Sequence, residues 1–487
     1  MSSTDGTIGT PAGSPSGTES TALKQAAEGS WPVLQTERNW GTIGLFGVTL
    51  SAGIAAWSYA IGGSVSWYLG ATMGTLAMIA GSLVGMYFVT VAAMPISVKY
   101  GIDTIAACKP QYGSYGSAFG IFAQYTSIIG WNCILIIILG RTTANVLEAA
   151  NVIHGSNTKL YVSIAVTMCT LALIYWMVAR GSDSVRDNSV WIAVAVSLTG
   201  LMVLVVLIWK DGWHTIASAK PSAAFSDLHL NYTLGFEILV ATVLSWWPYM
   251  GGIMRMSRSA KQAIWPSMIC LGMITGIIGL IGLYAGLATG ESDPSVFFVK
   301  TLGIWMGIVA IVFIALANIG TAIVGVYAST IGLKQIPALQ YRVSYRWATL
   351  IVIAPVVIVC AFFQNVFMAH ILTFMYFLGL VFAPICAVQI VDFYVFRKHR
   401  LHLPSLFDYS KNGQYYYWGG VNPAAFIATG VGFVLYYWLL NPVTYAQHFP
   451  FKWISASVPT IIATGFVYWV LTKFWIVRVG KGGYAKA

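Results

Sequence analysis

Residues 234–262 decide how this chain folds, and they read LGFEILVATVLSWWPYMGGIMRMSRSAKQ. The stretch is apolar over about 20 residues, the length that an α-helix needs to cross a bilayer. Its middle is poor for a helix, because Pro248 lacks an N–H group and the following Gly251-Gly252 pair weakens the helix further. Irregular backbone inside a bilayer persists only where protein or a water-filled cavity surrounds it. The stretch therefore predicts a broken membrane span with Trp246 and Trp247 at mid-depth, and the alternative is a proline-kinked helix with interfacial aromatic residues.

Composition places the chain among all-α polytopic membrane proteins. Of its 487 residues, 57% are hydrophobic and 8% are charged, and the mean hydropathy is +0.74. Soluble proteins carry about 25% charged residues. A transmembrane β-barrel shows short alternating strands rather than long apolar runs. The six cysteines form no C-x-x-C pair, so we expect them to be small buried side chains rather than disulfides or metal ligands.

Long apolar runs predict twelve transmembrane helices. They cover roughly residues 42–66, 69–95, 117–140, 160–179, 188–209, 234–256, 264–289, 302–333, 347–363, 367–391, 421–440 and 456–477. Residues 1–30 are rich in Gly, Ser, Thr, Pro and Ala and lack the apolar core of a signal peptide. The predicted organisation is a disordered cytoplasmic tail (1–40), a ten-helix core (41–392), a cytoplasmic loop (393–420), two additional helices (421–478) and a cytoplasmic C-terminal tail (479–487).

The distribution of basic residues predicts the orientation in the cell membrane. With the N-terminus inside, 20 of the 26 Lys and Arg residues fall on the cytoplasmic side and 6 on the outer side. Short cytoplasmic loops of membrane proteins carry such an excess, so both termini are predicted to be cytoplasmic. The net charge of +11 is thereby explained by these loops, and nucleic acid is not an expected partner.

A second broken span is predicted near the N-terminus. Residues 51–57 read SAGIAAW and Gly62-Gly63 follow, so this span is rich in small residues at mid-depth. The two irregular spans lie five spans apart and therefore cross the membrane in opposite directions. This arrangement is typical of an inverted repeat of spans 1–5 and 6–10, with a binding site between the two broken helices. Small residues also occur at ordinary helix contacts, which is the alternative.

Three motifs resemble the nucleobase–cation symporter family, which includes permeases for cytosine, uracil, allantoin and hydantoin. Residues 392–422, DFYVFRKHRLHLPSLFDYSKNGQYYYWGGVN, resemble the family's loop after span 10. Residues 108–117, CKPQYGSYGS, look like its turn between spans 2 and 3, and Arg255–Lys261 match the segment after span 6. The resemblance covers the whole chain. It implies the leucine-transporter fold, a five-plus-five inverted repeat with two added helices, and secondary transport of a planar nitrogen heterocycle.

Site residues follow from the same resemblance, since a flat substrate needs aromatic faces and a few polar groups. Trp131 in span 3 aligns with a stacking tryptophan, although helix packing is its alternative role. Leu135 stands where hydantoin-specific members carry glutamine, which puts hydantoin in doubt. The complete set of expected substrate-binding residues is Gly53, Ile54, Ala55, Trp57, Gln124, Trp131, Asn132, Ser245, Trp246, Trp247 and Asn318.

Two points of this set stay open. The second aromatic residue of the site falls on Val243 by ungapped alignment and on Trp246 or Trp247 with a short gap, and we prefer the tryptophans because Pro248 follows them. At least one of these two adjacent residues is expected to face elsewhere. Asn318, a lone amide in an apolar helix, is equally suited to a hydrogen bond between helices.

The resemblance also implies a sodium site, formed by the carbonyls of Leu50, Gly53 and Ala317 and the hydroxyl of Thr321. Gly320 stands where sodium-coupled members have a second hydroxyl, so we expect weak coupling to sodium or coupling to protons. Sodium and protons are the only ions expected, and no organic cofactor is implied.

Acidic side chains give no sign of a counter-ion for the substrate. Glu237 is the only acidic residue within a span, and its spacing of nine residues from Trp246 places it some 13 Å away, near the outer mouth. Asp392 is expected to organise the basic loop that follows it.

An amino-acid, amine or vitamin-precursor transporter remains the alternative within transport. A membrane enzyme is disfavoured by the lack of HExxH or paired carboxylates in the spans, and a channel by the lack of charged rings. The expected partners are the substrate and lipid, with no obligate protein partner.

Overall fold

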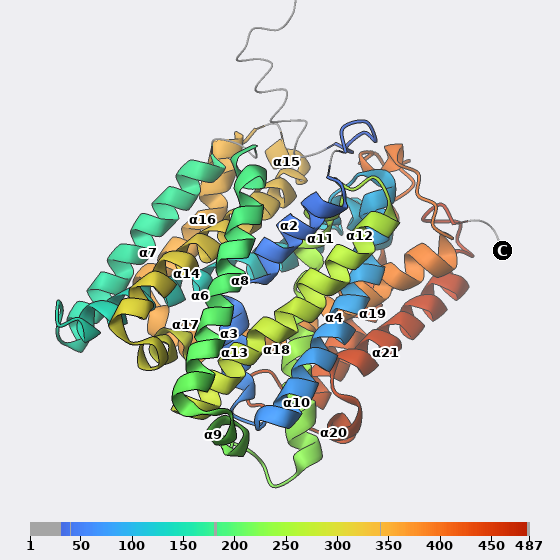
Figure 1. The fold of residues 1–487 in the computed structure, drawn as a ribbon. Helices are drawn as coiled ribbons and strands as arrows, with labels where there is room; N and C mark the ends of the chain where they lie inside the picture. The colour runs from blue at the N-terminus through green and yellow to red at the C-terminus, as the bar shows by residue number, and fades with distance from the viewer. Residues whose placement is uncertain (1–30, 39, 180–182, 341, 485–487) are drawn as a thin grey trace, which may run out of the picture.

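The described structure is built mainly of long helices lying side by side (Figure 1). It is a computed structural model that describes residues 31–484 except 39, 180–182 and 341. The first repeat contains α2 (Thr42–Gly53), α3 (Ala56–Val65), α4 (Ala71–Tyr100), α5 (Thr104–Tyr112), α6 (Ala118–Ala149), α7 (Ser156–Val178), α8 (Asp183–Asp211) and α9 (Trp213–Ser218).

The second repeat and the added helices follow in the same manner. They comprise α10 (Leu228–Leu244), α11 (Trp247–Met254), α12 (Ala260–Pro266), the π-helical η1 (Ser267–Met273), α13 (Ile274–Thr289), α14 (Pro294–Lys334), α15 (Pro337–Gln340), α16 (Tyr345–Phe362), α17 (Gln364–Ala369), α18 (Ile371–Ile390), η2 (Val391–Phe396), η3 (Pro404–Leu406), α19 (Pro423–Leu439), α20 (Phe451–Ile454), α21 (Ser457–Leu471) and η4 (Thr472–Ile476). Each of the twelve predicted spans overlaps one of these helices or a set of consecutive helical segments.

Ten spans are evident from length and hydropathy in the described part of the chain. Eight helices are individually long and apolar enough to cross a bilayer, and each of two bent pairs forms one more span. The remaining two predicted spans correspond to α8 and to α19, which is apolar but only 17 residues long. The polytopic all-α prediction is therefore confirmed.

Both predicted breaks are present. The axes of α2 and α3 differ by 54°, with Ile54 and Ala55 extended between them, and the axes of α10 and α11 differ by 42°. Pro248 lies in the first turn of α11, where its missing N–H removes no helical hydrogen bond. Proline therefore starts the second half-helix, and the chain bends just before it.

Glycines bring the broken spans into close contact with their neighbours. A Cβ atom added to Gly62 in α3 would lie 1.8 Å from the carbonyl oxygen of Gly279 in α13. One added to Gly81 in α4 would lie 2.5 Å from the carbonyl oxygen of Phe236 in α10. Only glycine permits such approaches, so the small residues of the first span serve helix packing as well as the break.

The C-terminal helices α19 and α21 lie along the edge of the molecule opposite α7 (Figure 1). Glu237 of α10 connects both helices to the core. Its side chain accepts a hydrogen bond from Tyr436 Oη of α19 at 3.0 Å. It also accepts from Ser457 Oγ at 2.5 Å and from the Ser457 amide at 3.1 Å, both at the start of α21. The Ser457 amide lies in the first turn of α21, where it has no partner within its own helix. Glu237 was expected near the outer mouth of the site. The structure places it instead in a buried contact with the added helices.

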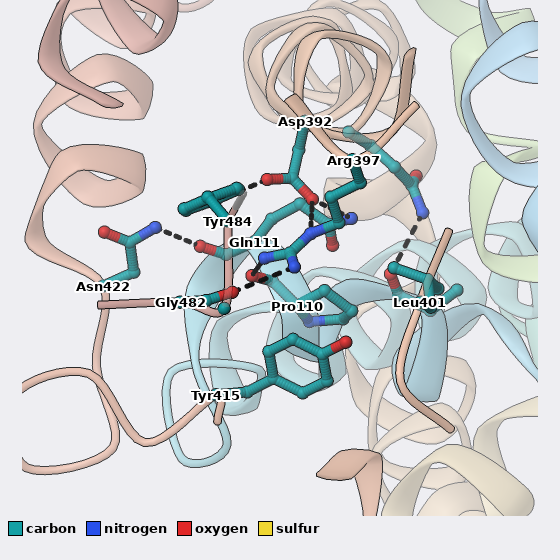
Figure 2. Close-up of polar contacts among 12 residues, drawn as sticks. Pro110, Gln111, Asp392, Arg397, Leu401, Tyr415, Asn422, Gly482 and Tyr484 are labelled. Carbon is teal, nitrogen blue, oxygen red and sulfur yellow. Dashed lines mark hydrogen bonds and ion pairs between the residues drawn. The ribbon is translucent and has the colours of Figure 1, made fainter. Parts of the chain in front are cut away.

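The motifs 108–117 and 392–422 form one assembly at the side predicted to be cytoplasmic. Asp392 and Arg397 make a buried ion pair with Nε and Oδ2 2.6 Å apart (Figure 2). Arg397 also donates to the carbonyls of Pro110 and Gly482, at 2.8 and 3.0 Å, and Asp392 accepts from Tyr484 Oη at 2.6 Å. A buried pair is tolerated only with such additional hydrogen bonds.

This ion pair joins three segments that are distant in sequence. Asp392 and Arg397 belong to the end of span 10, Pro110 to α5, and Gly482 and Tyr484 to the C-terminal segment (Figure 2). Residues 31–38 also contact this side, since the amide of Val33 donates to the carbonyl of Gly101 at 2.8 Å. Residues 1–30 of the predicted tail lie outside the described residues.

A second buried polar group lies beside this assembly, between spans 2 and 3. Lys109 of α5 donates to Gln335 Oε1 at 3.2 Å, and Gln335 Nε2 donates to Asp103 Oδ1 at 3.2 Å. Burial lowers the pKa of the Lys109 ammonium to about 8, since the charged form has lost its water. These contacts connect α5 to the end of α14 at the predicted cytoplasmic surface.

Candidate binding site

A small cavity lies at the bend of span 6, against the bend of span 1. Its walls come from four spans: Trp57 of α3, Trp131 and Leu135 of α6, Thr321 of α14, and a face of α10 and α11 formed by Thr242, Ser245, Trp246 and Tyr249. The helix breaks, which local sequence predicts, thus border the cavity. Spans 3 and 8 pack against these breaks and contribute the remaining walls of the cavity.

Four aromatic rings surround the space. Trp57 lies between the other two indoles, with its ring centroid 5.3 Å from that of Trp131 and 5.7 Å from that of Trp246. The Trp246 and Tyr249 centroids are 5.2 Å apart. All three pairs are edge-to-face, at 60°, 66° and 62°, so the rings make the walls of a box rather than a parallel slot.

Hydroxyl groups supply the polar part of the wall. Ser245 accepts a hydrogen bond from Trp131 Nε1 at 2.9 Å and donates to the carbonyl of Thr242 at 2.5 Å, so it orients the indole. Within the described residues, the buried Thr242 Oγ1 and Thr321 Oγ1 have no hydrogen-bond partner. A buried hydroxyl without a partner is costly, and a bound ligand can satisfy both.

The two adjacent tryptophans point in different directions. Trp246 lines the cavity, whereas Trp247 is fully buried away from it, packs on Phe382 and donates to Gln389 Oε1 at 2.7 Å. Positions 242, 245, 246 and 249 recur at i, i+3, i+4 and i+7, which is one helix face. This period continues through the bend. The same periodicity identifies Trp246 rather than Trp247 as the tryptophan that lines the cavity. It also identifies Thr242 and Tyr249, which the sequence analysis did not include among the expected site residues.

Three expected amides lie outside the cavity wall. Gln124 donates to the carbonyl of Pro248 at 3.0 Å, and thereby supports the bend from the side of α6. Asn318 accepts from the Ala56 amide at 3.0 Å and donates to the carbonyl of Leu135 at 2.8 Å, so it connects α14 to the start of α3 and to α6. Asn132 is buried, and its Nδ2 has no partner among the described residues.

The residues of the expected ion site are only partly free to bind an ion. The carbonyl of Leu50 accepts from the Ile54 amide at 3.1 Å, and that of Gly53 accepts from Ser58 Oγ at 3.2 Å. Each carbonyl keeps a second lone pair. Ala317 is buried in α14, and Thr321 offers an oxygen without a partner. Ile54 and Ala55 form the extended connection of span 1 and do not line the cavity.

The cavity is small in this conformation. Its volume of about 20 Å³ is room for one water molecule. A heterocyclic ring is several times larger, so it can enter only when the aromatic walls separate. The walls belong to different spans, and a relative movement of these spans would open the site.

Two broken spans that meet at a cavity are typical of secondary transporters with the leucine-transporter fold. Residues 32–472 match the protein family described as permeases for cytosine/purines, uracil, thiamine and allantoin. The chain belongs to this family, so the family and the class of protein expected from the three motifs are confirmed, and the chain is a transporter rather than an enzyme.

Relatives of known structure or description share low identity over nearly the whole chain. The purine-uracil permease NCS1 of Arabidopsis thaliana is 21% identical, over 92% of this chain and 77% of that protein. The nucleobase-cation-symport-1 transporter Mhp1, closed with bromovinylhydantoin bound, superposes with a TM-score of 0.72 at 17% identity, covering 92% of this chain and 96% of Mhp1. Its inward-facing form gives 0.75 at 16%, covering 92% and 94%.

A more distant structure has the same fold. A sodium-coupled sialic acid symporter, substrate-bound and outward-open, superposes with a TM-score of 0.59 at 11% identity, covering 93% of each chain. Such identities establish the fold alone. The substrate of this chain must therefore be argued from its own residues.

Proposed function

We propose that the aromatic cavity is the substrate site of this permease and that it carries a planar nitrogen heterocycle across the membrane. The observation that carries the proposal is the meeting of Trp57, Trp131 and Trp246 at the two helix breaks. Aromatic faces stack on a heterocycle, and the free hydroxyls of Thr242 and Thr321 pair with its polar edge. Of the relatives named above, the Arabidopsis thaliana protein is described as a purine-uracil permease, and Mhp1 holds bromovinylhydantoin.

Transport proceeds by alternating access around this site. The close glycine contacts tie α3 to α13 and α4 to α10, so spans 1, 2, 6 and 7 form a compact set. Trp131 and Thr321 lie on α6 and α14 of the other set. Rocking of one set against the other separates the rings on alternate sides of the membrane, which is how this fold exposes a fixed site.

We further propose import across the cell membrane with both termini in the cytoplasm, which rests on the excess of basic residues on that side. Coupling to sodium is proposed to be weak. Thr321 can contribute an oxygen, but Gly320 provides no second hydroxyl, and the carbonyls of Leu50 and Gly53 already accept one hydrogen bond each.

An amino-acid or amine transporter on the same fold is less well supported. A primary ammonium group loses strong hydration when it is buried and requires a carboxylate partner. The lining residues include no Asp or Glu, and the Glu237 carboxylate is occupied by Tyr436 and Ser457.

The proposal is tested by uptake in proteoliposomes against a panel of bases, hydantoins, allantoin and thiamine precursors. Trp131→Ala should reduce apparent affinity for the transported compound, because it removes one wall of the site. Trp305→Ala is the control, since that tryptophan of α14 is 83% exposed and does not line the cavity. Equal kinetics of the two variants at equal reconstituted amounts would exclude Trp131 from the site.

A further inference from the structure

The last span ends in a group of basic and aromatic side chains at the edge of the molecule. Helix α21 and η4 together form one apolar span, and α21 lies at the edge formed by the C-terminal helices (Figure 1). Lys473, Arg478 and Lys481 lie at the end of this span, and Phe474 and Trp475 lie between the first two. Lys473, Arg478 and Phe474 are exposed. Positive charges and apolar rings are therefore both accessible where the span leaves the bilayer.

The three basic side chains contact aromatic rings rather than carboxylates. Lys473 Nζ and Arg478 Cζ each lie 5.4 Å from the centre of the Phe474 ring. Lys481 Nζ lies 5.9 Å from the centre of the Trp418 ring. Among the described residues, no ion pair or hydrogen bond joins any of the three to an acidic side chain. Three like charges thus lie at the end of one span without a counter-charge.

These charges are close enough together to share one ligand. Lys473 and Arg478 flank the same ring, and the Trp418 and Trp475 centroids are 5.6 Å apart, which places Lys481 beside the same end of the span. Like charges repel one another, and the repulsion is greater beside a bilayer than in bulk water. An anion between them removes this repulsion. Phosphate suits the group, because a guanidinium binds two phosphate oxygens at once and an ammonium binds as a point charge.

The surroundings indicate a phosphate that belongs to a lipid. Phe474 and Val479 are about half exposed, at 48% and 54%, and they lie beside the basic residues on the same segment. A soluble anion would leave these side chains in water, whereas the acyl chains of a phospholipid would cover them. Basic clusters directly after a membrane span attract the headgroups of anionic lipids.

The same segment completes the buried ion pair of the C-terminal assembly. The carbonyl of Gly482 accepts a hydrogen bond from Arg397 at 3.0 Å, and Tyr484 Oη donates to Asp392 at 2.6 Å (Figure 2). Lys481 directly precedes Gly482 in the chain. A ligand that holds the Lys481 side chain therefore also restrains the residues on which the ion pair depends.

We propose that Lys473, Arg478 and Lys481 form a binding site for the headgroup of an anionic phospholipid, with Phe474 and Val479 against its acyl chains. The phosphate oxygens accept hydrogen bonds from the three basic side chains. Bound lipid stabilises the C-terminal segment and, through it, the buried ion pair. This site is separate from the aromatic cavity, so the inference does not rest on the proposed function.

The experiment measures thermal unfolding of the purified full-length protein in detergent micelles that contain increasing amounts of phosphatidylglycerol, which is anionic, or phosphatidylcholine, which carries no net charge. Phosphatidylglycerol should raise the unfolding midpoint by several degrees, and phosphatidylcholine should raise it much less. The amount of phosphatidylglycerol that gives half of the shift measures the apparent affinity.

A variant that carries Lys473→Gln, Arg478→Gln and Lys481→Gln should need about tenfold or more phosphatidylglycerol for the same shift, because each basic residue near a membrane surface contributes to the attraction. Without anionic lipid its midpoint should equal that of the original protein, since the three charges have no carboxylate partner to lose. The single substitutions Lys473→Gln and Arg478→Gln, each with an expected loss of about threefold, provide the test if the triple variant does not fold.

The matched control removes two lysines and one arginine elsewhere on the side predicted to be cytoplasmic. It carries Lys261→Gln, Arg346→Gln and Lys411→Gln, three exposed positions, and should change the apparent affinity less than about twofold. A loss in the control equal to that in the site variant would show general attraction to a basic surface and overturn the proposal.

The remaining outcomes are equally decisive. An undiminished effect of phosphatidylglycerol on the site variant, or on both single variants, overturns the proposal. Inorganic phosphate and glycerol 3-phosphate, added at the same concentrations, should leave the midpoint unchanged, and a shift equal to that of the lipid would assign the site to a soluble phosphate instead. A lipid effect that only the site substitutions weaken supports the inference.

Discussion

The adjacent residues Trp246 and Trp247 allow a sharp test of the site, because the same substitution has different consequences one position apart. Trp246 faces the cavity and packs against Trp57 and Tyr249, with centroids 5.7 and 5.2 Å away. Trp247 is fully buried on the other side of the helix, against Phe382. Trp246→Ala and Trp247→Ala therefore remove a wall of the site and a part of the packing core, respectively.

The expected magnitudes follow from these environments. Loss of a ring that stacks on a heterocycle costs about 1–3 kcal/mol, which is about a 5- to 150-fold loss of apparent affinity. Trp247→Ala deletes a fully buried indole and should lower the free energy of unfolding by about 3–5 kcal/mol. It also leaves Gln389 Oε1 without its donor at 2.7 Å, which adds to the loss of stability.

The assay measures uptake kinetics in proteoliposomes together with thermal unfolding in detergent. Trp246→Ala should raise the apparent KM with a modest change in stability. Trp247→Ala should reduce stability and yield, and the fraction that folds should keep its apparent KM. If both variants raised the apparent KM equally, with reconstituted amounts matched, the assignment of Trp246 to the site through the helix face 242, 245, 246 and 249 would be refuted.

Three further predictions concern the buried ion pair, the bend of span 6 and the expected sodium site. Asp392→Asn should destabilise the protein by about 3–5 kcal/mol, because Arg397 then remains buried without its counter-charge; thermal unfolding measures this, and an unchanged midpoint would contradict the structure of the ion pair. Single cysteines through residues 245–252 should react with small aqueous thiol reagents in a pattern, with positions 246 and 249 protected by substrate and 247 inert, whereas uniform inertness would indicate an ordinary kinked helix. Removal of sodium should reduce uptake only weakly, and strong stimulation at low millimolar sodium that Thr321→Ala abolishes would mean that the missing hydroxyl at Gly320 matters less than we infer.

Residue types and short sequence patterns by themselves determined the spans, the positions of their breaks and the family of this protein. The long apolar runs specify the spans, because a bilayer requires about 20 apolar residues with every backbone group paired within the helix. Gly53 and Pro248 mark where the spans break, since glycine weakens a helix and proline cannot continue a preceding one. The motifs at 108–117 and 392–422 were sufficient to indicate the family. These features depend on residues close together in sequence, so the sequence alone reveals them.

The tertiary structure decided how these pieces meet. Which of Trp246 and Trp247 faces the cavity depends on the rotation of α10 and α11 against α3, α6 and α14. Asn318 was equally suited to a ligand and to a helix contact, and its bonds to Ala56 and Leu135 follow from the approach of three spans. Likewise, Asp392 and Arg397 are close in sequence, but their carbonyl and tyrosine partners come from α5 and the C-terminal segment. Contacts between distant segments depend on packing of the whole bundle, which no local pattern encodes.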